Sequence, residues 1–236
     1  MPDPGFTGRF GKLIYYNMNG KKYVRSVPSR VRQTKATKAR AGEFGRASGL
    51  GKVIRGQLES VIPAPKDNNM QTRLVTSIYR WLLDWKDQNE SKKVQPWSLV
   101  GFQFHLQSNR LAVRWKTRLD IRIDKPGQVQ ILIPSFVPTE AIMAPKDTVS
   151  VVCRIATCVS DTGRKFPLGS DDKELVFEYG KKPVPAKTIA FDLLTPSGSL
   201  VLTGVSLEYR VSVNGYVSAT KNKNYMPSEI VDAKYV

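Results

Sequence analysis

The sequence has few of the residues from which catalytic and metal sites are built. Its 236 residues include one histidine, His105, and two cysteines, Cys153 and Cys158. One imidazole excludes any site that needs two histidines. Two thiols exclude a disulfide-rich scaffold and a four-cysteine zinc site. We therefore expect no catalytic residues, no metal site and no cofactor, and predict that the protein is not an enzyme.

Long apolar runs are also missing. The longest, near residues 131–133 and 149–152, are far shorter than the roughly 18 residues of a membrane span. The first ten residues lack the apolar core of a secretory signal. We therefore expect a protein without a membrane span, located in the cytoplasm or in a particle such as a virion.

Acidic residues are scarce relative to basic ones. The chain has 37 Lys+Arg against 20 Asp+Glu, a net charge of +17. Residues 1–60 hold 13 of the basic residues and only three acidic ones. The hydrophobic content of 41% is typical of a folded protein, so we expect a hydrophobic core despite the excess of positive charge. A field of this sign attracts nucleic acid, anionic membrane or an acidic protein.

The basic residues are densest at positions 21–40, where no acid occurs. The residues predicted to contact nucleic acid are Lys21, Lys22, Arg25, Arg30, Arg32, Lys35, Lys38 and Arg40. Tyr15, Tyr16 and Tyr23 adjoin them and could stack on bases or form hydrogen bonds. Cations that neutralise phosphates give salt-dependent binding to DNA or RNA with little sequence preference. The alternatives are docking on an acidic protein surface, or a solubilising segment with no partner.

The N-terminal residues have the pattern of a β-hairpin. Strand-forming residues at 10–16 and 21–27 flank a turn that contains Asn19-Gly20, a dipeptide that tolerates positive φ. Residues 29–38 contain one large apolar side chain, Val31, and are interpreted as an extended basic arm.

Two helices are expected next. The first has Thr34 or Thr37 as its cap, and its apolar residues step by three or four at Phe44, Ala47, Leu50, Ile54, Leu58 and Val61. Its five glycines indicate a close approach to another surface or a broken helix. The second is expected at about 67–88, with Asp67 or Asn68 as its cap.

After residue 97 the pattern becomes that of β-strands. Predicted strands lie at 99–106, 111–115, 119–123, 128–133, 149–159, 173–179, 188–193, 200–213 and 216–220. Many short strands separated by turns favour an antiparallel sandwich or barrel. The predicted fold class is mainly β with an N-terminal α part. The expected divisions are a basic hairpin and arm at 1–33, a helical segment at 34–96 and an antiparallel β-sandwich at 97–236.

Three polar features of the β-region receive structural interpretations. His105 alternates with Phe102 and Phe104, so we expect it half-exposed on the opposite face of a strand. Cys153 and Cys158 are five residues apart in one predicted strand, and therefore on opposite faces and unable to bond. We expect them to be reduced and buried. The acidic pair Asp171-Asp172 is expected in a solvated turn.

The N-terminal motifs resemble those of a known family. They are Gly8-Arg9-Phe10-Gly11-Lys12, Asn19-Gly20-Lys21, Arg25-Ser26-Val27-Pro28 and Arg32-Gln33-Thr34. They are similar to the Gly-Lys, Asn-Gly-Lys and Arg-Ser-x-Pro hairpin of a domain-of-unknown-function family in uncharacterised Bacteroidota proteins. The resemblance implies a recurring structural module at about residues 5–60, followed by a helix start and β-rich domains, and it implies no activity.

Two functions are compatible with these observations. The first is a homo-oligomeric structural subunit, such as a coat or filament component, whose basic N-terminal region contacts nucleic acid or a neighbouring subunit. The second is a cytoplasmic accessory protein that binds nucleic acid through the same region. The exposed apolar residues of the hairpin favour the first, because an isolated hairpin is marginally stable.

Overall fold

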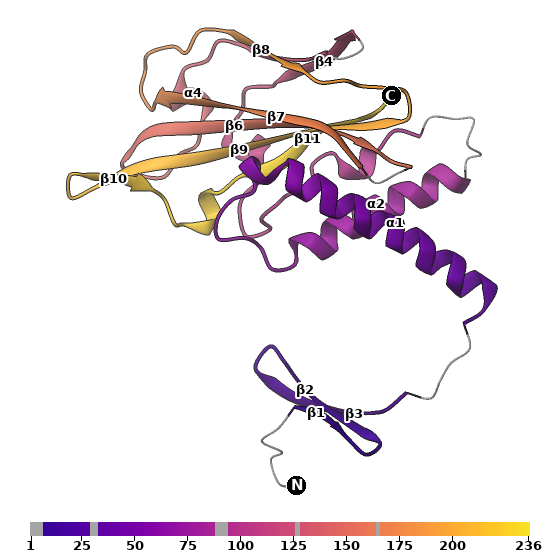
Figure 1. Cartoon of the computed structure of the whole chain (residues 1–236). Helices are drawn as coiled ribbons and strands as arrows, with labels where there is room; N and C mark the ends of the chain where they lie inside the picture. The colour runs from indigo at the N-terminus through magenta and orange to yellow at the C-terminus, as the bar shows by residue number, and fades with distance from the viewer. Residues whose placement is uncertain (1–6, 29–32, 88–93, 126–127, 164–165) are drawn as a thin grey trace. The chain divides into compact units, whose positions relative to one another are not determined.

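The computed structural model describes residues 7–28, 33–87, 94–125, 128–163 and 166–236. The described chain is mainly β, as predicted, with antiparallel sheets (Figure 1). Its contacts divide it into two compact units, Met1–Ala41 and Gly42–Val236. Within the described residues no helix is both long and apolar enough to cross a membrane.

The first unit contains a three-stranded antiparallel sheet. Its strands are β1 (Gly8–Phe10), β2 (Leu13–Met18) and β3 (Lys21–Ser26), in the order β1-β2-β3. Asn19 and Gly20 have φ values of 54° and 75° at the β2–β3 turn, so the Asn-Gly dipeptide forms the predicted hairpin. The third strand, β1, was not expected from the sequence.

Helix α1 (Lys35–Gln57) starts after Thr34, whose Oγ1 accepts a hydrogen bond of 3.1 Å from the Thr37 backbone N–H. Lys35 and Lys38 therefore lie in a helical turn and not in an extended arm. The predicted stripe is buried from Ala47 onward, whereas Phe44 is exposed and its ring contacts Tyr79. The helix ends close to a 3-10 helix, η1 (Glu59–Val61), and α2 (Met70–Asp87) follows.

The second unit contains two further sheets. One has the order β10-β9-β6-β7, with β11 also paired to β9. Its strands are β6 (Thr148–Asp161), β7 (Phe166–Glu178), β9 (Ser199–Val213), β10 (Tyr216–Ala219) and β11 (Ser228–Tyr235). The other has the order β4-β5-β8, formed by β4 (Asp120–Lys125), β5 (Gln128–Ile133) and β8 (Lys187–Asp192). The short elements are η2 (Trp97–Leu99), α3 (Leu111–Arg114), α4 (Pro138–Ala141) and η3 (Lys223–Tyr225).

The five-stranded sheet separates two hydrophobic cores. Alternate residues of β6, such as Cys153 and Ile155, pack toward the β4-β5-β8 sheet. Ala156 and Cys158 pack toward α1 and α2, which cover the other face (Figure 1). Because both faces of the sheet are covered, β6 and β9 have buried residues on both faces, which explains why their sequences do not alternate in polarity.

Two predicted strands are absent from the structure. Residues 99–106 form η2 and turns, and Gly101 there has a φ of 78°. Residues 111–115 form the short helix α3 and an isolated bridge at Trp115. Strand β11, by contrast, was not predicted, because Glu229, Asp232 and Lys234 interrupt its apolar residues.

Candidate functional site

The register of the N-terminal sheet assigns its side chains to two faces. Arg9 lies opposite Ile14, and Ile14 lies opposite Arg25, while Tyr16 lies opposite Tyr23. Directly opposed residues of antiparallel strands share a face. One face, called here the cationic face, carries Arg9, Ile14, Tyr16, Met18, Lys21, Tyr23 and Arg25. The other, called the apolar face, carries Phe10, Leu13, Tyr15, Asn17, Lys22, Val24 and Ser26.

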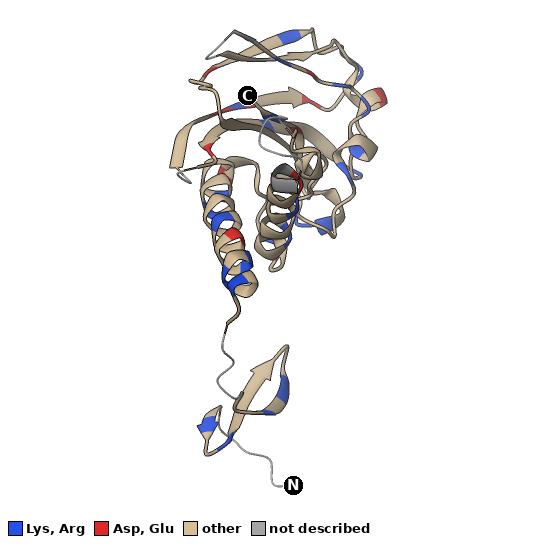
Figure 2. Ribbon diagram, turned by 90° about the vertical axis from the view of Figure 1, so that its right-hand side faces the viewer, with Lys and Arg blue, Asp and Glu red and all other residues tan. Residues whose placement is uncertain are grey.

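The cationic face combines positive charge with stacked rings. The Tyr16 and Tyr23 rings are stacked at 5.6 Å between centroids, and the Arg25 guanidinium lies 5.7 Å from the centre of the Tyr16 ring. The ribbon in Figure 2 is coloured for basic but not for acidic residues on the described part of this sheet. Aromatic rings beside cations are what sequence-tolerant binding to single-stranded nucleic acid requires.

The apolar face is open to solvent. Phe10 is 70% exposed, Leu13 39% and Val24 52%. None of the described residues from 7 to 28 is buried. The sheet thus exposes side chains that normally form a core.

The predicted basic residues do not form one surface. Lys21 and Arg25 share the cationic face, whereas Lys22 lies on the apolar face. Lys35, Lys38 and Arg40 are exposed on α1, whose first turn holds no acidic residue, so its positive end is not neutralised there.

Arg30 and Arg32 lie outside the described residues. Arg9, on the cationic face, was missed by the sequence analysis because the third strand was not recognised.

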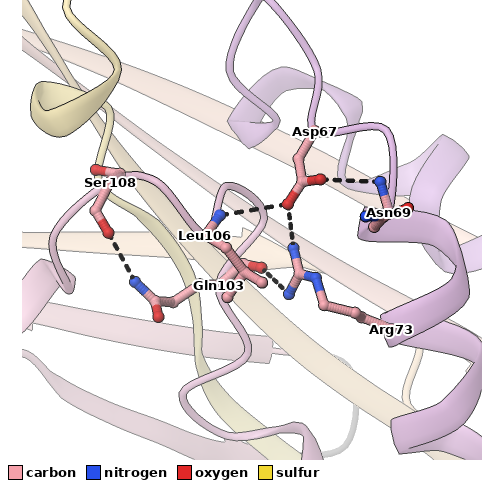
Figure 3. Close-up of polar contacts among 6 residues, drawn as sticks. All are labelled: Asp67, Asn69, Arg73, Gln103, Leu106 and Ser108. Carbon is pink, nitrogen blue, oxygen red and sulfur yellow. Dashed lines mark hydrogen bonds and ion pairs between the residues drawn. The ribbon is translucent and has the colours of Figure 1, made fainter. Parts of the chain in front are cut away.

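A second polar cluster joins the start of α2 to the segment 103–108 (Figure 3). Asp67 Oδ2 accepts hydrogen bonds from Arg73, at 2.7 Å, and from the Leu106 backbone N–H, at 3.3 Å. Its Oδ1 accepts from the Asn69 backbone N–H, and Arg73 also donates to the Gln103 carbonyl oxygen. Burial raises the pKa of Asp67, but these hydrogen bonds outweigh it and hold that pKa below its usual range.

We interpret this cluster as structural, because Asp67 and Arg73 pair with each other and with nearby backbone groups, while the buried Arg73 Nε has no hydrogen-bond partner. Asp67 or Asn68 was expected to cap α2, which begins at Met70. Asp67 instead bonds to the Asn69 and Leu106 backbone N–H groups and holds the loop beside the helix.

His105, expected half-exposed on a strand, is only 4% exposed and lies in a turn beside the Asp67 cluster. Its Nδ1 has no hydrogen-bond partner. Burial lowers its pKa, and the nearby charges of Lys223 and Arg73 lower it further against the opposing effect of Asp67. The prediction failed because the alternating aromatic residues fill a core from a turn, not from a strand.

The remaining polar candidates can also be located in the structure. Asp171 and Asp172 lie within strand β7, not in a loop. Cys153 and Cys158 are unbonded and buried on opposite faces of β6, as expected, and burial raises the pKa of each thiol to about 12. Buried Glu229 accepts a hydrogen bond of 2.8 Å from the backbone N–H of Leu111, at the start of α3. Among the described residues, no three His, Cys, Asp or Glu side chains are grouped to hold a metal ion.

Comparisons with known proteins add little to this description. No protein-family model matches the sequence, and no curated protein matches it. Among solved structures, a crystal structure of a protein from Archaeoglobus fulgidus is similar at 14% identity, covering 44% of this chain and 86% of that chain, with a TM-score of 0.19.

Proposed function

We propose that the protein is a non-enzymatic subunit of a homo-oligomeric assembly, and that its N-terminal sheet attaches each subunit to a neighbour. The observation that carries the proposal is the exposure of Phe10, Leu13 and Val24 on a sheet in which no described residue is buried. Three short strands become stable when an apolar face or a further strand is covered. Full burial of one valine or leucine side chain contributes roughly 1.5–3 kcal/mol.

The second unit can serve as the folded body of such a subunit. It has its own cores, on both sides of the five-stranded sheet. Its two cysteines are unbonded, which supports a reducing compartment such as the cytoplasm, or a particle formed there.

Deletion of residues 1–33 tests the proposal. All the buried apolar residues of the described chain lie at position 47 or beyond, so the shortened protein keeps both cores. In sedimentation velocity across a concentration series, we expect the full chain to form oligomers and the deletion variant to be monomeric. The proposal would be contradicted if the full chain and the deletion variant were both monomeric, or if both formed the same oligomer.

A matched pair of leucine variants separates the apolar face from general surface effects. Leu13→Asp is expected to weaken oligomerisation. Leu194→Asp removes an 80% exposed leucine of the second unit and is expected to leave oligomerisation unchanged. Equal effects of the two variants would argue against the N-terminal sheet as the contact.

A second candidate function is binding of nucleic acid through the cationic face, favoured by the stacked Tyr16 and Tyr23 rings beside Arg25. Stacking of a base on an aromatic side chain contributes about 1–3 kcal/mol. This function uses the cationic face, whereas the assembly proposal rests on the exposure of the apolar face.

The salt dependence of binding tests this candidate. Affinity for a labelled single-stranded oligonucleotide is measured by fluorescence anisotropy between about 50 and 200 mM salt. Changing Arg9, Lys21 and Arg25 together to Gln should reduce the log–log salt slope by about 2, because each lost phosphate contact contributes about 0.7. The control changes Lys181, Lys182 and Lys187, all exposed on the second unit, to Gln. A flat salt dependence, or equal losses in the two variants, would exclude the cationic face.

A further inference from the structure

The outer edge of β7 is a strand edge with no paired neighbour among the described strands. β7 runs from Phe166 to Glu178 and lies at the end of the five-stranded sheet, where it pairs with β6. An edge of this length presents unpaired backbone groups, and proteins usually protect such edges unless they use them to bind another chain.

The side chains of β7 give this edge a negative and apolar character. Residues 172, 174, 176 and 178 alternate along one face, and they are Asp172, Glu174, Val176 and Glu178, all exposed. Val176 is 56% exposed. Glu174 pairs with Arg154 at 3.0 Å, while among the described ion pairs none involves Glu178. The face thus carries an exposed valine between two carboxylates.

The N-terminal sheet has a complementary edge. β3 is the end strand of that sheet, so its outer edge is open among the described strands. Along its cationic face it carries Lys21, Tyr23 and Arg25, an exposed tyrosine between two cations. The spacing of two residues is the same as in β7, and the charges are opposite in sign.

We infer that β3 of one copy adds to the edge of β7 of a second copy as an antiparallel strand. In the proposed register Lys21 lies opposite Glu178, Tyr23 opposite Val176, and Arg25 opposite Glu174. On the other face Val24 lies opposite Leu175, which is half-buried. Opposite charges and aromatic–β-branched pairs are the cross-strand pairs that stabilise sheets. This inference rests on the proposed assembly function and names its acceptor surface.

The orientation follows from the pairing energetics. A parallel alignment would also bring cations to carboxylates, with Lys21 opposite Glu174, but parallel ladders are slightly less stable per residue. Each copy has one β3 and one β7, so two copies can close a reciprocal dimer, and contacts that do not close in this way extend into a ring or a filament.

A charge exchange between two full-length variants tests the contact. Lys21→Glu and Glu178→Lys each place like charges opposite each other, and each alone should self-associate about tenfold more weakly in sedimentation velocity. A one-to-one mixture should recover wild-type association. In the mixture, the carboxylate introduced into β3 of one variant meets the ammonium group introduced into β7 of the other, and the reciprocal contact is wild-type.

The controls define the outcomes that overturn the inference. Lys22→Glu reverses a charge on the other face of β3, and Glu178→Lys should not rescue it. Failure of the mixture to associate, or rescue of Lys21→Glu by Glu174→Lys in place of Glu178→Lys, would overturn the antiparallel contact between copies. The inference would also be overturned if association recovered only in a double variant that carries Lys21→Glu and Glu178→Lys in one chain, because the contact would then be intramolecular.

The same series separates the two levels of the proposal. If the charge variants associate like the wild type while deletion of residues 1–33 still abolishes oligomers, the assembly function stands and β7 is not the acceptor. If the deletion has no effect, the assembly function itself is wrong. Unchanged melting temperatures of the variants show that folding is not the cause.

Discussion

At the scale of the residue, His105 makes one part of the stability depend on pH near neutrality. Burial lowers its pKa in the folded chain below the ordinary value of 6.5. The unfolded chain therefore binds the proton more readily. The stability contributed by the neutral imidazole is complete above about pH 6.5 and is lost as the pH falls through that value toward the lowered pKa.

We expect the wild type to lose stability relative to His105→Gln between about pH 7.5 and 5.5, by no more than about 1.4 kcal/mol per pH unit. Urea unfolding of both proteins at the two pH values measures this. Glu229 and Asp232, whose pKa values are raised by burial, act in the opposite direction, and the comparison with the variant cancels them. Identical pH dependences of the two proteins would show that His105 titrates normally.

At the scale of the element, close packing between layers depends on single glycines. A Cβ atom at Gly204 in β9 would lie 2.9 Å from Val61 Cγ2, in η1, and 3.8 Å from the Glu229 carbonyl oxygen of β11. Gly51 in α1 has a similar role, because its Cβ would lie 3.1 Å from Val75 Cγ2 in α2. By contrast, nothing lies within 4 Å of a Cβ at Gly42 or Gly56.

Gly204→Ala should therefore destabilise the protein by about 1–3 kcal/mol, because the added methyl group overpacks the core between β9 and η1. Gly56→Ala, in the open part of α1, should stabilise it by about 0.5–1 kcal/mol through helix propensity. Chemical unfolding midpoints measure both. Loss of stability in both variants would indicate that backbone conformation, not space, sets the preference for glycine.

The elements that could be predicted from the sequence are those with a local signal. Such a local signal marks the Asn19-Gly20 turn and the cap at Thr34. It also marks the long strands β6 and β9, which are rich in apolar residues. Residues 101–104 misled the prediction because Phe102 and Phe104 alternate like a strand. Their backbone instead bonds to β11, with Gly101 N–H donating to Ile230 and Phe104 N–H to Ser228. Because β11 lies more than 120 residues further along the chain, residues 101–104 carry no local pattern that predicts this pairing.

The candidate site shows the same limit. Its charge could be predicted, since an acid-free basic segment is visible in the sequence, but its two faces could not. They depend on the pairing of Arg9 with Ile14 and of Ile14 with Arg25. The sequence also gave no sign that Glu174 and Glu178 lie on an edge strand, because edge position depends on strand order.

At the scale of the whole molecule, the shared central sheet couples the helical layer to the sandwich. Cys153 belongs to the core between the two sheets and Cys158 to the core beneath the helices. We expect both thiols to become reactive at the same urea concentration, where the circular dichroism signal is lost. Variants with Cys153→Ala or Cys158→Ala assign the reaction to one thiol. Earlier exposure of Cys158 would show that the helical layer opens by itself.

The hydrogen bond between η1 and β11 has a consequence for the order of folding. The Ser228 hydroxyl donates to the Val61 carbonyl oxygen, and Ile230 and Ala233 complete the core that contains Leu50 and Leu74. The helices are synthesised before the sheet they cover, yet their core closes only when residues 228–235 have been added. Contacts this distant in sequence slow folding. During synthesis, we therefore expect the apolar residues of the helices that pack on the sheet to stay exposed until nearly all of the described chain has left the ribosome.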